Sequence, residues 1–255
     1  MFTDTHTHLY LPEFDNDLDS VILNAKENQV SRFLLPNIDL KTIPKLIELC
    51  QKNKNVLFPM IGLHPCSVDT NYITQLDDLY KHITKDKFIA IGEIGIDLYW
   101  DQTMINEQTS AFSIQIEIAQ KHNLPIVIHC RNSFNEIYNV IIQKKKKPNK
   151  GVFHCFSGDY NQAKKIIELG FLLGVGGVIT FKNSNLKEVI KKIDLKHIIL
   201  ETDSPYLAPT PIRGSRNEPK HIPIIAQKIA EIKNIDISKV AEETQINVNN
   251  LFFDK

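Results

Sequence analysis

The strongest constraint on the fold is a regular alternation of short apolar segments with amphipathic segments along the whole chain. Segments with apolar residues at helical spacing, such as Phe14–Glu27 and Asn106–His122, separate eight segments that have the length and composition of strands. The eight expected strands are Thr3–Leu9, Arg32–Pro36, Val56–Leu63, Phe88–Ile96, Pro125–His129, Gly151–Cys155, Phe171–Val175 and His197–Asp203. This pattern over 255 residues predicts the α/β class and a (β/α)8 barrel, the TIM-barrel fold.

A doubly wound open sheet is the competing α/β fold. It usually has fewer strands, and it carries a glycine-rich phosphate loop after its first strand, where this chain has histidines. Gly174, Gly176 and Gly177 lack the following Gly-Lys-Ser/Thr of a P-loop. Because no linker, low-complexity tract or shift in composition divides the chain, we expect a single domain over residues 1–255.

Composition narrows the possible partners and location. Lysine plus arginine equals aspartate plus glutamate, 30 against 30, so any contact with nucleic acid must be local. No apolar run reaches the roughly 20 residues that span a bilayer, so no membrane partner is expected. The four cysteines form no disulfide framework, and Met1 runs directly into a polar motif that does not resemble a signal peptide. These features favour a reduced, cytoplasmic location.

The first candidate metal ligands lie in the first expected strand, which has the sequence TDTHTHL. Strand alternation places Asp4, His6 and His8 on one face. Burying two imidazoles and a carboxylate is costly unless a metal ion takes up their lone pairs. On this motif alone, histidines that simply face water explain the pattern equally well.

The later strands end in matching side chains. Active sites of TIM barrels lie at the C-terminal ends of the strands, so side chains at those ends should meet on one face. The strand-end residues are His6, His8, His64, Glu93, His129, His154 and Asp203. A satisfied polar core group explains any one of these histidines, but chance explains five at strand ends poorly. All but His64 fit a two-metal hydrolase site with ligands from the first, fourth, fifth, sixth and eighth strands.

Three carboxylates receive specific roles. Glu93, from a strand in the middle of the order, can reach both ions as a bridging and catalytic ligand. Asp203 can both ligate a metal and accept the proton of the attacking water, so it is the candidate general base. Glu201 lies two residues earlier and one layer deeper, where a carboxylate can orient a ligand histidine.

Substrate contacts are expected from the same face. His64 and Arg131 lie at strand ends, and Arg216 lies on the loop after the last strand. A cation beside a metal pair suits a phosphate, which accepts charge-assisted hydrogen bonds, so these three residues are predicted to bind substrate.

Two further features bear on nucleic acid. Tyr99, Trp100 and Tyr206 could stack on bases at the same rim, although loop packing explains them equally well. The lysine run at 144–147 lies between a helix and the next strand, on the opposite face of a barrel. We therefore interpret it as a solvated helix C-terminus and not as a DNA-binding patch.

Seven motifs follow one another along the chain: THTHL at the N-terminus, IGLHP at 61–65, IGEIGID at 91–97, IHCR at 128–131, FHCFSG at 153–158, LETDSPYLAP at 200–209 and RGSRNEP at 213–219. Together they resemble the TatD family of amidohydrolase-like metal-dependent hydrolases. The resemblance covers essentially the whole chain, with the motifs in order. It implies a TIM barrel, divalent metals and phosphodiesterase activity on DNA.

The family pattern also implies an assignment of ligands. His6 and His8 bind one metal with Asp203, Glu93 bridges, and His129 with His154 bind the second, all in the numbering of this sequence. One residue departs from the pattern. Tyr10 stands where the family usually has Asp or Asn after the HxHL unit.

The leading interpretation is a deoxyribonuclease of the TatD type that cleaves phosphodiester bonds with a metal-activated hydroxide at a two-metal site. The histidines suit Zn, Mn, Co or Ni, whereas the resemblance brings in Mg. The alternative keeps the site and changes the substrate to an ester or amide, as in a D-aminoacyl-tRNA deacylase, which would make tRNA the partner in place of DNA. A non-enzymatic binding module would lack a ligand or the base, yet the set is complete. The sequence leaves the oligomeric state open.

Overall fold

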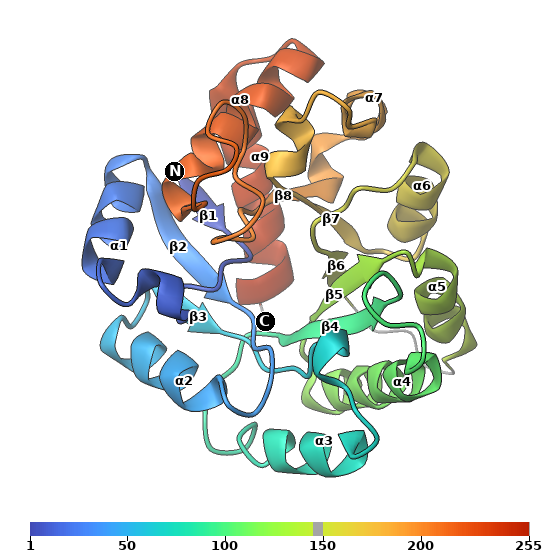
Figure 1. Ribbon diagram of the computed structural model, residues 1–255. Helices are drawn as coiled ribbons and strands as arrows, with labels where there is room; N and C mark the ends of the chain where they lie inside the picture. The colour runs from blue at the N-terminus through green and yellow to red at the C-terminus, as the bar shows by residue number, and fades with distance from the viewer. Residues whose placement is uncertain (145–149, 255) are drawn as a thin grey trace.

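The computed structural model describes residues 1–144 and 150–254, and its strands and helices alternate in one barrel, as the sequence predicts. The strands are β1 (Phe2–Asp4), β2 (Val30–Leu35), β3 (Leu57–Pro59), β4 (Ile91–Asp97), β5 (Ile126–Arg131), β6 (Gly151–Phe153), β7 (Leu172–Val175) and β8 (Ile198–Leu200). The helices are α1 (Leu18–Glu27), α2 (Ile43–Lys52), α3 (Tyr72–Tyr80), α4 (Ile105–His122), α5 (Phe134–Gln143), α6 (Tyr160–Glu168), α7 (Leu186–Lys192), α8 (Ile222–Lys233) and α9 (Ile237–Val248). Figure 1 looks into the barrel, with α1 to α6 arranged around the strands. Within the described ranges, no helix is long and apolar enough to cross a membrane.

The barrel closes through two short seams between groups of parallel strands. The first group pairs in the order β1-β2-β3 and the second in the order β4-β5-β6-β7-β8. Parallel bridges join the groups, from Ile61 to Ile91 at one seam and from Thr7 to Ser204 at the other. All strand C-terminal ends therefore face the same way, and their side chains can meet over one mouth.

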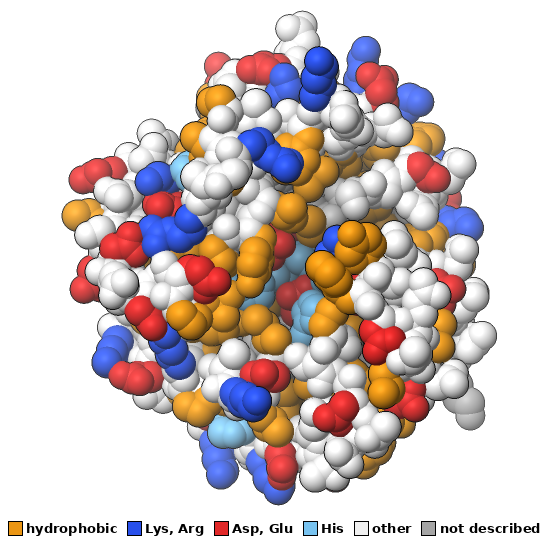
Figure 2. Space-filling model, in the orientation of Figure 1, with side chains coloured by type: hydrophobic (Ala, Val, Ile, Leu, Met, Phe, Trp, Pro, Cys, Tyr) orange, Lys and Arg blue, Asp and Glu red, His pale blue; other side chains and the backbone are white. Residues whose placement is uncertain are grey.

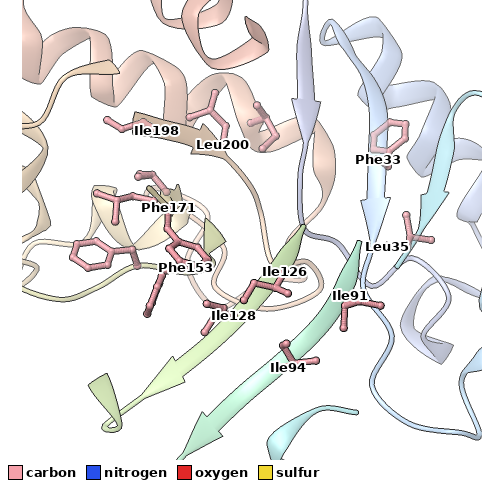
Figure 3. Close-up of a cluster of buried hydrophobic side chains, with 14 of the residues drawn as sticks. Phe33, Leu35, Ile91, Ile94, Ile126, Ile128, Phe153, Phe171, Ile198 and Leu200 are labelled. Atoms are coloured by element: carbon pink, nitrogen blue, oxygen red, sulfur yellow. The ribbon is translucent and has the colours of Figure 1, made fainter. Parts of the chain in front are cut away.

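Apolar side chains cover the outer face of the strands. They also fill the barrel interior at the end away from the mouth. The outward set packs against the helices, and Figure 3 shows Phe33, Ile94, Ile128 and other members of this cluster. The inward set comprises Leu34, Met60, Ala90, Val127, Val152 and Ile199, and it packs against Val248, Leu251 and Phe252 of the C-terminal segment. Since side chains alternate along a strand, the next inward position after Val127 is His129, nearer the mouth. The inside therefore changes from apolar to ionisable toward the C-terminal ends.

The first and last strands are shorter than the sequence predicts, and this changes the interpretation of Asp4. The first strand ends at Asp4 and the last at Leu200, so His6, His8 and Asp203 lie beyond the strand ends, beside the isolated bridge between Thr7 and Ser204. Alternation therefore does not extend from Asp4 to the histidines. The buried Asp4 carboxylate accepts hydrogen bonds from the backbone N–H groups of His6 and Thr202, at 3.3 and 2.9 Å. It joins the ends of β1 and β8 and is not part of the candidate metal centre.

The lysine run falls mostly outside the described residues, which exclude Lys145, Lys146 and Lys147. Lys144 is described, and its Nζ lies 2.6 Å from Ser113 Oγ and 2.7 Å from Glu117 Oε1, both on α4. This first lysine of the run is therefore engaged with a neighbouring helix.

Candidate metal centre

The mouth of the barrel is hollowed, with histidines and acids at its floor. Figure 2 shows the hollow at the centre of the face, with pale blue histidines and red carboxylates inside it. The cavity has a volume of about 650 Å³, and its lining includes His8, His64, Glu93, His129, His154 and Asp203. His6 lies beneath them, fully buried, with its Nε2 3.2 Å from Glu93 Oε2. All seven strand-end residues named from the sequence therefore converge.

Glu93 is the centre of the cluster. It comes from β4, is 3% exposed, and directs its two carboxylate oxygens to two different groups of imidazoles. Oε1 lies 2.8 Å from His129 Nδ1 and 2.7 Å from His154 Nε2. Oε2 lies 3.2 Å from His6 Nε2 and 3.9 Å from His8 Nε2. One carboxylate thus spans the two sets of ring nitrogens, as a bridging ligand requires.

Asp203 completes the group around His6 and His8. Its Oδ1 lies 3.7 Å from His6 Nε2 and 3.5 Å from His8 Nε2. The residue has a left-handed backbone, with φ of 57°, and its N–H donates to the His6 carbonyl at 2.9 Å. This conformation, which Asp tolerates better than most residues, turns the chain after β8 and brings the carboxylate to the β1 histidines. Burial raises the pKa of Asp203, but the contact with His8 and the charge of His6 outweigh it, so the carboxyl pKa is lowered.

Asp97 supports His129 from behind, a contact that the sequence interpretation missed. His129 Nε2 lies 2.9 Å from Asp97 Oδ2, while Asp97 Oδ1 accepts hydrogen bonds from the backbone N–H groups of Tyr99 and Trp100 at 2.9 and 3.3 Å. Burial raises the pKa of Asp97, but the bond from His129 and these N–H groups outweigh it and lower the pKa to about 2. The residue therefore stays ionised and favours a proton on His129 Nε2, which leaves a lone pair on Nδ1.

Tyr10 supports His8 in a similar way, and its role was also missed. Its hydroxyl donates to the Pro36 carbonyl at 2.7 Å and lies 2.9 Å from His8 Nδ1. Since the phenol proton is already used, the hydroxyl oxygen accepts from His8 Nδ1–H. The phenol therefore takes the place at which the family pattern usually has a short polar side chain.

Glu201 lies behind His154, as predicted from its place one layer deeper. His154 Nδ1 is 3.4 Å from Glu201 Oε1, a distance typical of an ion pair but too long for a good hydrogen bond. The same oxygen accepts from the backbone N–H of Cys155. Gly174 makes room for the carboxylate, because a Cβ there would meet Glu201 Oε2 at 2.4 Å.

The donor set fits divalent cations. With protons on their outer nitrogens, His129 and His154 direct lone pairs at Glu93 Oε1, so two acceptor nitrogens face an acceptor oxygen at 2.8 and 2.7 Å, within hydrogen-bond distance. A cation between them removes that conflict. Burial raises the pKa of Glu93, but the imidazoles of His154, His64 and His6 outweigh it and hold the pKa well below its usual range.

Three overlapping groups of side chains could each hold an ion, because their ligand atoms lie within 4.8 Å of one another. They are His6, His8 and Asp203; His6, Glu93 and His154; and His64, Glu93 and His129. Nitrogen and carboxylate donors of this kind suit Zn, Mn, Co or Ni. The structure brings the predicted ligands together, while the number and identity of the ions stay predictions.

Two of the three predicted substrate contacts lie at the cavity. His64 lines it and has its Nε2 3.4 Å from Glu93 Oε1. Arg131 lines it at the end of β5, with its guanidinium carbon 4.0 Å from the Tyr99 ring centre and 5.3 Å from that of Trp100. The aromatic rings hold the cation at the rim by cation–π contact.

Arg216 is engaged elsewhere, so its interpretation as a substrate contact is corrected. Its guanidinium contacts both carboxylate oxygens of Asp17, at 2.9 and 2.6 Å, and Glu218 Oε1 at 3.0 Å. It also donates to the Glu13 carbonyl at 2.6 Å, and it is absent from the residues that line the described cavity. With its charge compensated by two carboxylates, Arg216 fastens the loop after β8 to the start of α1.

A TIM barrel with a buried cluster of histidines and carboxylates at the C-terminal ends of its strands defines a metal-dependent hydrolase. The family model described as TatD related DNase matches residues 3–253, and the chain belongs to this family.

Relatives agree with this assignment. YabD of Bacillus subtilis (strain 168), an uncharacterized metal-dependent hydrolase, is 36% identical over 258 residues, covering 99% of each chain. The crystal structure of YJJV, a TatD homologue from Escherichia coli K12, superposes with a TM-score of 0.93 at 27% identity, covering 100% of this chain and 98% of that one. A TatD family hydrolase from Entamoeba histolytica gives a TM-score of 0.88 at 26% identity, with the same coverage.

Proposed function

We propose that this metal-dependent hydrolase is a deoxyribonuclease of the TatD type, which cleaves phosphodiester bonds of DNA at the mouth of the barrel. The observation that carries the proposal is the position of Arg131, at the rim of the cavity whose floor holds the metal-ligand cluster. A phosphodiester needs cationic partners for its negatively charged oxygens. The family model, described as TatD related DNase, supports the same substrate class.

We assign one ion to His6, His8, Glu93 and Asp203, and a second to Glu93, His129 and His154. Bound divalent ions neutralise charge on a phosphoryl group and lower the pKa of a water molecule. Glu93 positions the two sets of ring nitrogens on either side of one carboxylate. Asp97, Tyr10 and Glu201 fix the orientation of the rings.

Asp203 is the proposed general base. Among the carboxylates of the cluster it reaches the cavity best, with a side chain 16% exposed against 3% for Glu93 and 1% for Glu201. Its lowered pKa keeps it ionised at neutral pH, which is the form that can accept a proton. The water oxygen attacks phosphorus, its proton passes to Asp203, and the bond to the leaving oxygen breaks.

The rim carries groups suited to a nucleic-acid strand. Trp100 is 70% exposed and Tyr206 is 51% exposed, and both line the cavity, where bases could stack on them. Arg131 next to Trp100 offers a cation to the adjoining phosphate. This combination of stacking and charge favours a single strand, whose bases are accessible.

The test is a turnover assay with three substrates: single-stranded DNA, duplex DNA and tRNA carrying a D-amino acid. Each is incubated with metal-loaded protein and with protein treated with a chelator. Metal-dependent release of nucleotides or DNA fragments supports the proposal. Deacylation of tRNA without DNA cleavage would instead assign the ester alternative, since the same cluster can polarise a carbonyl. Cleavage that survives complete metal removal would contradict both.

A further inference from the structure

The five imidazoles of the cleft differ in what their outer nitrogens contact. His8, His129 and His154 each direct that nitrogen at an oxygen, of Tyr10, Asp97 and Glu201 respectively. An oxygen acceptor favours a proton on the outer nitrogen and a lone pair on the inner one. The Glu201 contact of His154 is an ion-pair distance of 3.4 Å, and the buried Nδ1 atoms of His154 and His6 have no hydrogen-bond partner among the described residues. His6 Nε2 lies between Glu93 and Asp203.

His64 is arranged the opposite way. Its Nδ1 accepts a hydrogen bond from the backbone N–H of Cys66 at 3.1 Å, because His64 caps the short helix η2 (Pro65–Ser67). A backbone N–H can only donate, so Nδ1 must carry the lone pair. In the neutral ring the proton then sits on Nε2. That nitrogen points into the cleft, 3.4 Å from Glu93 Oε1.

Distance alone would admit His64 as a metal ligand, because its nitrogen groups with ligand atoms of Glu93 and His129 within 4.8 Å. The capping bond argues against this role, since a protonated Nε2 has no lone pair to give. Glu93 Oε1 is also approached more closely by His129 and His154, at 2.8 and 2.7 Å. His64 Nε2 therefore lies farther from Glu93 Oε1 than the ring nitrogens of His129 and His154 do, and His64 borders the cavity.

We infer that His64 is not a metal ligand and that it donates an Nε2–H hydrogen bond to an oxygen of the bound substrate. This inference rests on the proposed function for the identity of that oxygen, a phosphoryl oxygen of DNA. A donor fixed in advance by the fold stabilises charge that develops on such an oxygen without reorganising during the reaction. The fold thus supplies histidines for two different tasks in one cleft, and for His64 the hydrogen bond that its outer nitrogen accepts from Cys66 sets the task.

The first test uses no substrate. Protein with nitrogen-labelled histidine is loaded with an NMR-active cadmium isotope. The ring nitrogens are assigned with variants that each replace one histidine. We expect cadmium coupling at His6, His8, His129 and His154, and an uncoupled His64 protonated at Nε2. Cadmium coupling at His64, or a proton on its Nδ1, would overturn the inference.

The second test separates donation from ligation by activity and metal content. His64→Leu should keep the full metal content while kcat and kcat/KM fall together, by about 10²–10³-fold, as for loss of one preorganised donor. His64→Gln, whose amide can still donate, should retain more turnover than His64→Leu. His82→Leu is the control, since it removes an imidazole that lies near Asp86 and outside the cleft.

Loss of metal from His64→Leu, or equal turnover in the wild type and His64→Leu, would contradict the inference. If the protein cleaves no DNA at all, the proposed function fails in the substrate assay. The labelled spectra and metal content of His64→Leu still decide whether His64 is a ligand.

Discussion

The two sides of the metal centre are supported differently. On the β5/β6 side, which we define as His129 and His154, each imidazole has a carboxylate behind it. On the β1/β8 side, which we define as His6, His8 and Asp203, the support for His8 is the neutral phenol of Tyr10. A carboxylate behind an imidazole raises its basicity as a ligand more than a neutral hydroxyl does.

This difference suggests a division of labour. The β5/β6 side has two carboxylate-supported donors and suits tight retention of a cation. The β1/β8 side has weaker support but holds Asp203, the carboxylate of the cluster that reaches the cavity best. The chemistry that moves a proton is therefore expected on the β1/β8 side, and the following predictions test that comparison.

The largest effect is expected from Asp203→Asn. The amide keeps the shape and one ligating oxygen but loses basicity, so metal should remain bound while turnover on a short DNA falls by about 10²–10⁴-fold. Metal content by elemental analysis is measured beside the rate at saturating metal. Asp78→Asn is the matched control, because that acid pairs with Lys81 on the surface. A fully metallated Asp203→Asn enzyme with wild-type turnover would remove Asp203 from the mechanism.

The next effect concerns the carboxylates behind the β5/β6 side. Asp97→Asn keeps an oxygen for the N–H groups of Tyr99 and Trp100 but weakens the acceptor for His129 Nε2. Metal affinity should fall by about 10–100-fold, and Glu201→Gln should act similarly through His154. Competition against a chelating dye measures both. Unchanged affinity in both variants would show that the carboxylates do not tune their histidines.

The fold and the convergence of the cluster were predictable because they follow from local patterns. Alternation along β5 sets Val127 in the filled interior and His129 two residues nearer the mouth. Parallel strands then bring such positions together whatever the loops do. Asp97 could have been found by the same rule, since it lies four residues beyond Glu93 along β4, on the same face.

Other contacts could not be found by such rules because they depend on loop paths. Arg216 stands after β8 like a substrate contact, yet its partner Asp17 is 199 residues away in sequence. Tyr10 lies beyond the end of β1, where strand alternation no longer applies, and its hydroxyl meets both His8 and the Pro36 carbonyl. These contacts form only when the barrel has folded and brings the loops together.

The arginine side chains near the metal centre give a third prediction. Arg131 lies at the cavity beside the β5/β6 side, whereas Arg216 is neutralised by Asp17 and Glu218. Arg131→Gln should raise KM for DNA by about tenfold, as for one lost charge-assisted hydrogen bond. Arg216→Gln should leave KM within about twofold, as for a substitution away from the site. Steady-state kinetics at fixed salt compares the two, and a larger KM effect for Arg216→Gln would return it to the substrate path.

The smallest effect is expected from Tyr10→Phe, which tests the neutral support of the β1/β8 side. The change removes one hydroxyl from a side chain that is 2% exposed and leaves the ring in place. Because a neutral hydrogen bond contributes about 1 kcal/mol, metal affinity should fall only about fivefold, less than for Asp97→Asn. The same dye competition, run on both variants, measures the ratio directly. A loss in Tyr10→Phe equal to or greater than that in Asp97→Asn would mean that the phenol supports His8 as strongly as a carboxylate supports His129. The two sides would then be equivalent in support, and proton transfer on the β1/β8 side would rest on the exposure of Asp203 alone.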